Sequence, residues 1–416
     1  PTGCAAALAN GKTLNRFLHF PYGKRMNETP SNLMKSSTSS IKSYLRDMQC
    51  LFGYLTDEWS MKSRSAFAWE EHRLSEGRQD LDGNKNRKFG GVPLRFQFGD
   101  VQQLPAVAAK SLHDPTVPKP PQSSDAVGRL LLKDFLEPKH ESDHSIPIIM
   151  DKVIRQKDPA FKEVLQKMRD GTMDDKAVDF LLKRRFEYLS PEEQELFWQE
   201  AVFLMPTWAR TKPITLQYMQ NIGNAIVIVH ADTSGVKHPS HMSDFSVPTT
   251  NVLMKGAMMQ LLANGVVEEH VYNGQIGVCR DILFSEAKGP HAHNSPRPSY
   301  VVLEMSHKIP LDKVFDPENP THVPIADHEF SCSYGCCKMR TIPLRVMKAS
   351  SIHKAQGISV GPTESIKRCV IGVSAGGKSM TPGLDLVGFS RATEQGALAL
   401  WNDLKFSKKD LLAIGR

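Results

Sequence analysis

Two neighbouring carboxylates, Asp57 and Glu58, offer the clearest chemistry in the chain, because they follow an apolar run at residues 48–55. Such a run predicts a buried parallel strand that ends in two acidic side chains at its carboxyl tip. Ligands bind at that edge of open α/β sheets. Asp57 could hold Mg²⁺ through water, and Glu58 could activate the water that attacks a nucleotide. A solvated loop is the alternative interpretation.

A second strand signal also ends in a carboxylate. Residues 92–98 are strand-like and stop at Gly99-Asp100, and Gln103 follows three residues later. A glutamine at this place can sense the terminal phosphate of a bound nucleotide. Two such strands in one domain favour a magnesium-nucleotide site that includes Asp100 over a pair of unrelated loops.

Near the C-terminus, Arg391 stands in the run Gly388 to Thr393. A guanidinium there could give a planar pair of donors to a γ-phosphate from a facing domain. The run at 372–379 fits the phosphate-loop pattern letter for letter. We dismiss it, because Pro382-Gly383 would end within one turn the helix that such a loop needs.

Two further clusters have ordinary explanations. His328, Cys332, Cys336 and Cys337 could bind a metal ion, but their spacing is not that of a standard zinc pair, and packing is the favoured explanation. Trp198 and Trp208 flank an apolar stretch, which predicts that both fill a core.

Composition limits the classes of protein without choosing one. The chain has 416 residues and a formal net charge of +7, which suits an acidic partner such as nucleic acid but also fits a mildly basic enzyme. Seven cysteines in so long a chain indicate a reducing compartment rather than a disulfide framework. No apolar run is long enough to span a membrane, so no membrane contact is expected.

The order of elements predicts two stacked α/β domains. We expect a first domain at 1–140 with a polar insertion at about 22–45, and a second at 141–258 and 341–416 that is interrupted by a small β module at 259–340. Helices are expected at 161–169 and 176–186, with a further helix start at Ser190. Strands are expected at 224–230, 345–349, 369–373 and 384–389.

At this point the ordered motifs resemble one family. The chain is similar to the Pif-type (petite integration frequency) DNA helicases of superfamily 1 from its start to about residue 400. Pro1-Thr2-Gly3 with Gly11-Lys12-Thr13 resembles the first DNA-contacting motif, and Asp57-Glu58-Trp59-Ser60-Met61 the Walker B element. The remaining matches are Gly99-Asp100 with Gln103-Leu104-Pro105, Arg155-Gln156, residues 271–277, His353-Lys354-Ala355-Gln356-Gly357 and Ser390-Arg391-Ala392.

The resemblance implies two RecA-like P-loop NTPase domains with a small β-barrel insert in the second. It implies an ATP-dependent DNA helicase that uses ATP and Mg²⁺, translocates 5′ to 3′ on single-stranded DNA and opens duplex junctions. Glu58 would be the base, Asp57 the magnesium holder and Gln103 the phosphate sensor, with Arg155 and Arg391 as transition-state charges. The residues implied to contact DNA are Thr2, Gly3, Thr13, His353, Lys354, Gln356 and Gly357.

The sequence departs from the family pattern in three places. Asn15 replaces the usual histidine, and Ala106 a second proline. The Gly-rich Walker A loop is expected before Pro1, so we expect the chain to be an N-terminally truncated part of the protein that is inactive alone. A degenerate, non-hydrolysing remnant that binds single-stranded DNA or a partner is the alternative.

The resemblance also suggests genome maintenance, namely DNA repair, recombination and telomere maintenance. We expect a nuclear location, with mitochondrion and cytoplasm as alternatives. The preferred DNA structure and the oligomeric state stay open.

Overall fold

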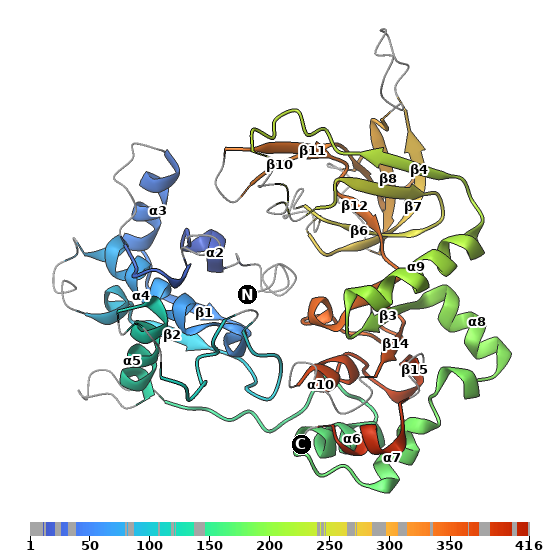
Figure 1. Ribbon diagram of the computed structural model, residues 1–416, viewed down its shortest axis with the longest axis horizontal. Helices are drawn as coiled ribbons and strands as arrows, with labels where there is room; N and C mark the ends of the chain where they lie inside the picture. Colours follow the sequence, from blue (N-terminus) through green and yellow to red (C-terminus); the bar gives the residue numbers. More distant parts are fainter. Residues whose placement is uncertain are drawn as a thin grey trace. The chain divides into compact units, whose positions relative to one another are not determined.

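The chain forms two compact units in the computed structural model, residues 1–153 with 381–383 and residues 154–380 with 384–416 (Figure 1). The first boundary falls 13 residues beyond the predicted one at 140/141. The structure describes residues 11, 14–20, 26–31, 39–79, 81, 87–106, 109–117, 120, 122–136, 146–238, 242, 245, 247–263, 271, 273–284, 297–306, 314–332, 336–364, 366–373, 383–401 and 406–414.

Unit 1 contains a two-stranded parallel sheet of β1 (Gly53–Thr56) and β2 (Leu94–Gln97). The prediction of two parallel strands is confirmed, but the first is shorter than expected. Residues 48 and 49 belong instead to helix α3 (Ser39–Gln49), which also takes up the end of the expected polar insertion. The other helices of this unit are α2 (Leu14–Phe17), α4 (Arg64–Arg78) and α5 (Ser124–Leu136), with short 3-10 helices η2 (Trp59–Met61) and η3 (Lys88–Gly91).

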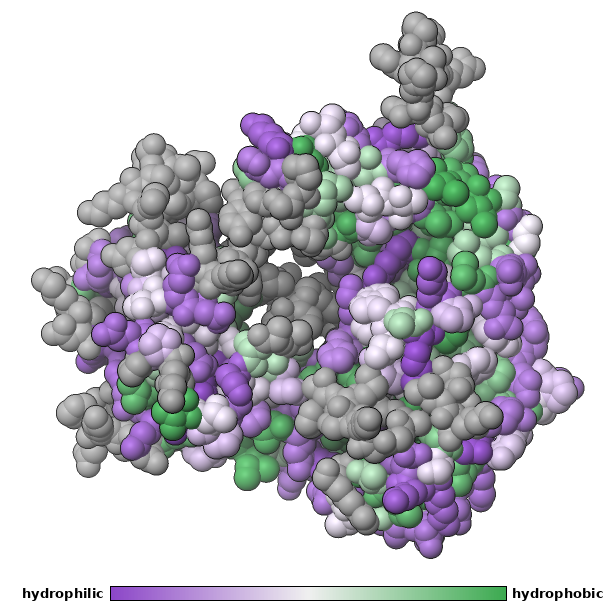
Figure 2. Space-filling model, viewed as in Figure 1, coloured by the Kyte–Doolittle hydropathy of each residue, from purple (hydrophilic) through white to green (hydrophobic). Residues whose placement is uncertain are grey.

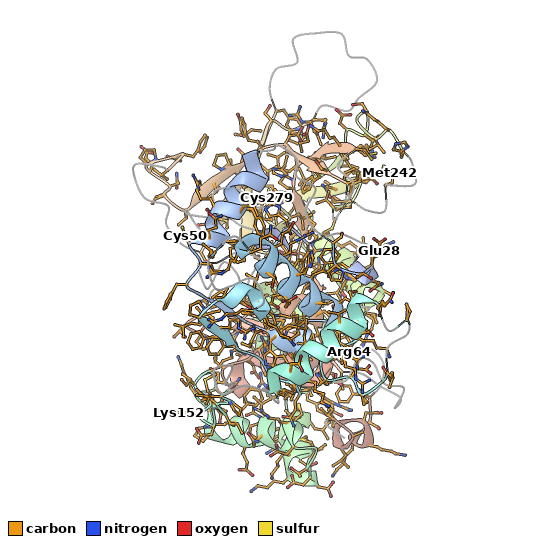
Figure 3. The ribbon with its side chains drawn as sticks, turned by 90° about the vertical axis from the view of Figure 1, so that its left-hand side faces the viewer. Glu28, Cys50, Arg64, Lys152, Met242 and Cys279 are labelled. Atoms are coloured by element: carbon orange, nitrogen blue, oxygen red, sulfur yellow. The ribbon has the colours of Figure 1, made fainter. Side chains whose placement is uncertain are left out.

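Helix α4 is the central helix of unit 1. Ser63 caps it by accepting a hydrogen bond from the N–H of Ala66 at 3.0 Å. Its first residue, Arg64, is fully buried and forms an ion pair with Asp125 of α5 at 3.4 Å (Figure 3). A Cβ atom on Gly128 of α5 would lie 1.9 Å from the carbonyl oxygen of Arg64, so only glycine permits this approach of the two helices.

The sheet of unit 1 is not buried on both faces, contrary to the prediction. Leu55 is 71% exposed and Phe96 is 47% exposed, so apolar side chains face outward from both strands. The opposite side packs on the core formed by the helices. The buried members of that core are Leu18, Phe20, Tyr44, Met48, Phe67, Ala68, Trp69, Leu74, Phe89, Val92, Leu112 and Leu131.

Unit 2 contains a four-stranded parallel sheet in the order β13-β3-β14-β15. Its central strand β3 (Ala201–Met205) is buried at every position, as expected for a parallel strand covered on both faces. The other strands are β13 (Ala349–Ser351), β14 (Arg368–Gly372) and β15 (Leu398–Trp401).

Helices cover this sheet in Figure 1. The predicted helices are confirmed as α6 (Pro159–Arg169), α7 (Asp175–Leu182) and α8 (Pro191–Glu200), and Ser190 caps the last of these. Residues 384–389 were predicted as a strand and instead form helix α10 (Leu384–Phe389). Two further helices are α9 (Trp208–Ile222) and α11 (Lys408–Leu412), and the short 3-10 helices are η5 (Phe186–Tyr188), η8 (Ile352–Ala355) and η9 (Gln395–Ala397).

An antiparallel β module lies beyond α9 in the same unit. It includes β4 (Ile226–His230) paired with β5 (Thr250–Met254), a hairpin of β10 (His328–Ser331) and β11 (Lys338–Thr341), and a five-stranded sheet in the order β12-β6-β7-β8-β9. The strands of that sheet are β6 (Met258–Leu261), β7 (Ile276–Leu283), β8 (Tyr300–Met305), β9 (His322–Ile325) and β12 (Leu344–Val346). The module therefore begins more than 30 residues before the predicted start at 259.

The outer face of β4 is apolar, since Ile226 and Ile228 are each about half exposed. Figure 2 shows an apolar patch on this part of the module. Among the described helices of the chain, none combines the length and apolar character that a membrane crossing requires.

Candidate functional site

The predicted carboxylates of unit 1 lie at one edge of its sheet. Thr56 and Gln97 are register partners at the ends of β1 and β2, so both chains leave the sheet at the same place. The N–H of Trp59 donates to the carbonyl oxygen of Phe98 at 2.8 Å and holds the two exits together. Asp57 on the first exit is exposed, and Glu58 is half-buried. The sequence prediction of adjacent parallel strands with acidic ends is therefore confirmed in its geometry.

Glu58 has an unusual backbone conformation. Its φ of 54° and ψ of 42° place it in the left-handed region, which few residues other than glycine adopt. Its N–H donates to Oδ1 of Asp57 at 2.8 Å, which fixes the position of the neighbouring carboxylate. Backbone strain of this kind persists only where the surroundings enforce it, and it concentrates at functional sites.

A buried polar network anchors the loop that carries these carboxylates. Nζ of Lys62 lies 2.5 Å from a carboxylate oxygen of Glu70 and 2.9 Å from Oε1 of Gln97, at the end of β2. The hydroxyl of Tyr54 donates to the other oxygen of Glu70 at 2.9 Å. Burial, and then the nearby Glu70 carboxylate, raise the pKa of Tyr54 well above its usual value. Sequence analysis missed this network, because its members are 8 to 35 residues apart and carry no motif.

Gln103 contacts the second carboxylate, as its spacing suggested. Its Nε2 donates to Oδ2 of Asp100 at 3.3 Å, and its backbone N–H donates to the Asp100 carbonyl at 3.1 Å. The loop after β2 thus turns back on itself and presents an amide and a carboxylate together.

In unit 2, Arg155 and Arg391 lie on neighbouring segments but have different environments. Arg155 is half-buried, and its Nη1 donates to the carbonyl of Ser390 at 3.3 Å. Gln156 donates to the same carbonyl at 3.0 Å and to that of Ala392 at 3.2 Å. The structure therefore brings together the two motifs that the sequence placed 235 residues apart.

Arg391, predicted to give a pair of donors to a γ-phosphate, is buried in unit 2. Its side chain is 1% exposed, and it donates from Nε to the carbonyl of Val387 at 2.8 Å and from Nη1 to that of Ile358 at 3.4 Å. Since its donors point at internal carbonyls, Arg391 holds the chain segments after α10 and η8 in place in this arrangement.

The run from His353 to Gly357 follows β13 directly, at the carboxyl edge of the parallel sheet. His353 is half-buried, Lys354 is exposed and Gln356 is buried. Gly357 has a φ of 86°, so the turn that ends the run requires the freedom of glycine. Burial lowers the pKa of His353.

The prediction that Trp208 fills a core is wrong. Trp198 packs against the core around β3 as expected, but Trp208 is 45% exposed at the start of α9. The guanidinium of Arg345 lies 4.7 Å from the centre of the Trp208 ring, and Nζ of Lys354 lies 5.2 Å from it. We call these three residues the indole platform. Partial burial and the charge of Arg345 lower the pKa of Lys354 to about 8.

The indole platform borders a pocket of about 270 Å³ between α9, β5 and β12. Asn251 lines it, is 2% exposed and donates to the carbonyl of Ile342 at 2.8 Å, while its Oδ1 has no hydrogen-bond partner among the described residues. Stacking surface, positive charge and a buried amide are the groups that contact nucleobases and phosphates.

Several predicted positions lie outside the described residues. These are Thr2, Gly3 and Thr13, as well as all but the first two residues of the run at 372–379. Gly372 ends β14, so this run does follow a strand as the sequence indicated.

The sequence is similar to two curated proteins named ATP-dependent DNA helicase PIF1. The protein from Candida albicans is 26% identical over 291 residues, which are 68% of this chain and 29% of that protein. The protein from Emericella nidulans is 26% identical over 281 residues, which are 66% of this chain and 33% of that protein. The chain thus spans about a third of the length of these relatives. No protein-family profile matches it.

The fold is that of solved Pif1 helicases. The crystal structure of Pif1 helicase from Candida albicans has a TM-score of 0.67 at 19% identity and covers 99% of this chain and 84% of its own. Bacteroides Pif1 bound to ssDNA gives 0.67 at 19% identity, with 99% and 83% covered. Bacteroides Pif1 in complex with ADP-AlF3 and ssDNA gives 0.64 at 20% identity, with 100% and 83% covered. The predicted class, two RecA-like units with a β module in the second, is confirmed by these structures.

Proposed function

We propose that this Pif1-type chain forms the motor of an ATP-dependent DNA helicase, which translocates 5′ to 3′ on single-stranded DNA and opens duplex junctions. The observation that carries the proposal is the pair of parallel strands in unit 1, whose neighbouring ends present Asp57-Glu58 and Asp100 with Gln103. A nucleotide-driven motor needs this combination of carboxylates and amide. A remnant that only binds DNA has no physical need for it.

Within this proposal each strand-end side chain has a role. The exposed carboxylate of Asp57 offers the oxygen donors that Mg²⁺ prefers, so it would hold the ion through water. Magnesium would neutralise charge on the phosphates. Glu58 would accept the proton of the attacking water, and Gln103 would contact the terminal phosphate. Arg155, whose guanidinium is not fully buried, would supply positive charge from unit 2.

The direct test is strand separation by the full-length protein. We expect ATP hydrolysis that single-stranded DNA stimulates, and unwinding of a duplex with a 5′ tail but not of one with a 3′ tail. Unwinding from the 3′ tail alone, or no stimulation by DNA, would contradict the proposal. DNA repair, recombination and telomere maintenance are the proposed cellular tasks, and microscopy of the tagged full-length protein tests the proposed nuclear location.

In unit 2 we propose that the indole platform binds the strand, with Trp208 stacking on a base and Lys354 contacting phosphate. Trp208→Ala should weaken binding of single-stranded DNA by about tenfold, because stacking of one base contributes about 1–3 kcal/mol. Trp208→Phe should keep most of the affinity. Fluorescence anisotropy with labelled oligonucleotides at fixed salt measures both.

The matched control is Tyr188→Ala. Tyr188 is also exposed and also has an arginine, Arg185, over its ring at 5.7 Å. It lies on η5 beside β15 and is not part of the indole platform, so its removal should leave binding unchanged. Equal losses in the two variants would contradict a specific role for Trp208.

Binding of the strand should also depend on pH. Lys354 has a pKa of about 8, so it is charged below that pH and loses its charge as the pH rises through it. A bound phosphate favours the charged form and moves the transition upward. We expect affinity to fall severalfold between pH 7 and pH 9.5, and Lys354→Arg to remove this fall, because arginine stays charged. An unchanged pH profile in Lys354→Arg would assign the dependence to another group.

A further inference from the structure

Three thiols meet at the end of the β10–β11 hairpin where the chain connects its two strands. Sγ of Cys332 lies 3.6 Å from Sγ of Cys336, which lies 3.7 Å from Sγ of Cys337, and all three sulfur atoms lie within 4.8 Å of one another. His328 is not a member of this group, and its ring packs on Phe330 with 4.8 Å between centroids. His328 is therefore excluded from the four candidate ligands that the sequence suggested.

The two short sulfur–sulfur distances match those of a tetrahedral metal centre. Ligands at the usual Zn–S distance of about 2.3 Å lie about 3.8 Å apart at the corners of a tetrahedron. The two pairs of sulfur atoms at 3.6 and 3.7 Å thus already have nearly the separation of ligands along two edges of such a tetrahedron. They are too far apart for a disulfide bond, whose sulfur atoms are about 2.05 Å apart.

Hydrogen bonds of the hairpin hold the sulfur atoms in place. The N–H of Cys332 donates to the carbonyl of Cys337 at 2.9 Å, and the N–H of Cys337 donates back to Sγ of Cys332 at 3.3 Å. A backbone donor to sulfur stabilises the thiolate form, which is the form that binds metals. On its other edge β11 is fixed by the N–H of Lys338, which donates to the Gly235 carbonyl at 3.0 Å.

The surroundings restrict access to one side. Cys332 is 4% exposed and Cys337 is fully buried, whereas Cys336 is half-buried. The cluster around them is apolar and includes Phe245, Leu262 and Met339, and Met242, labelled in Figure 3, packs against it. An apolar shell with one half-exposed thiol admits an ion and then shields it from water.

We propose that Cys332, Cys336 and Cys337 bind one Zn²⁺ ion, with water or a further donor as fourth ligand. Three thiolates form a soft ligand set that suits Zn²⁺. The ion would fasten the end of the hairpin to the chain segment that crosses it at residues 232–236, where the N–H of Asp232 donates to the carbonyl of Arg340 at 2.8 Å. The role is structural, and the site belongs to unit 2, whereas the strand-end carboxylates that the proposed ATP hydrolysis uses belong to unit 1.

Zinc binds cysteine as the thiolate, so binding releases the thiol protons and zinc affinity should rise with pH.

The test is the metal content of the chain, expressed with zinc in the medium and purified without chelators. We expect about one zinc per chain by elemental analysis. Cobalt(II) added to zinc-free protein should give thiolate-to-metal charge-transfer absorption and tetrahedral ligand-field bands. Removal of zinc by a strong chelator should lower the melting temperature.

Cys336→Ser is the informative variant, because its side chain is half-buried and serine is nearly isosteric. It should lose most of its zinc, and each cobalt ion that it still binds should show about one third less charge-transfer intensity, since two thiolates of three remain. Cys50→Ser, at an exposed cysteine of unit 1, is the control and should keep both.

Three results would overturn the proposal. These are a chain that takes up no zinc, a Cys336→Ser variant that retains zinc as the wild type does, and a Cys332–Cys336 disulfide found by mass spectrometry in fresh protein. None of them bears on ATP hydrolysis, so this test and that of the proposed motor function fail independently.

Discussion

Glu58→Gln in the full-length protein should lower kcat for ATP hydrolysis at least 100-fold while ATP still binds, because removal of a general base costs about 10²–10⁴-fold in rate. Glutamine keeps the size and the polarity of the side chain but cannot accept the proton of the attacking water. The neighbouring Asp57 keeps its hydrogen bond, since the donor is the backbone N–H of residue 58. Steady-state hydrolysis with saturating single-stranded DNA and equilibrium binding of a fluorescent nucleotide measure the two effects separately.

Glu28→Gln is the matched control, since Glu28 is an exposed carboxylate of the same unit, labelled in Figure 3. It should leave both the rate and the nucleotide affinity unchanged. If Glu58→Gln hydrolyses ATP at the rate of the wild type, the proton acceptor is another group. If it loses nucleotide binding instead, the residue holds the loop rather than the water.

Lys348→Met should stabilise the protein by about 2–4 kcal/mol at pH 7, because a buried cation without a carboxylate partner is costly. Lys348 is fully buried in unit 2, and the hydrogen bond that its Nζ makes among the described residues is a long one of 3.4 Å, to the carbonyl of Gln199. The rings of Tyr218 and Phe203 lie 5.0 and 5.8 Å from Nζ. Burial, which the charge of Glu200 partly offsets, lowers the pKa of Lys348 to about 7.

The same lysine makes stability depend on pH. Its pKa is lower in the folded state than in the unfolded state, so the unfolded chain binds more protons between about pH 7 and pH 10.4. Stability of the wild type should therefore rise with pH in this window, by about 2 kcal/mol from pH 7 to pH 9. Denaturant unfolding at several pH values measures the slope, and Lys348→Met should remove this part of it.

Lys176→Met, at an exposed lysine of α7, is the control and should change neither the stability nor its slope. A Lys348→Met variant less stable than the wild type would show that the ammonium contributes more through its ring contacts than its burial costs.

Strands and their ends could be predicted where the pattern that indicates them lies within a few consecutive residues. The strand-end carboxylates and the strands that carry them followed from short apolar runs closed by acidic residues, and the register of β1 with β2 confirms them. The apolar run at 48–55 also contains the end of α3, because a short apolar run does not separate helix from strand. Residues 384–389 show the same ambiguity. There the helix of α10 places Gly388 where a Cβ atom would lie 3.3 Å from Ile352 of η8.

Contacts between residues far apart in the chain could not be predicted. The Lys62–Glu70 pair, the burial of Arg391 and the exposure of Trp208 all depend on which segments pack together. Motif spacing located Arg391 and the run after β13, but it did not indicate which of their polar groups are used inside the fold. The thiol cluster has the same origin, because only the closed hairpin brings Cys332 next to Cys336 and Cys337.

The exposure of Trp208 gives the protein a spectroscopic signal of its own. Trp69 is 3% exposed and Trp208 is 45% exposed, and the other three tryptophans lie between the buried and the exposed class. Excitation of indole therefore yields a red-shifted emission component from Trp208 that a stacked base would quench. Titration of unlabelled oligonucleotide into the wild type and into Trp208→Phe, whose difference isolates that component, would measure occupancy of the indole platform by a DNA strand.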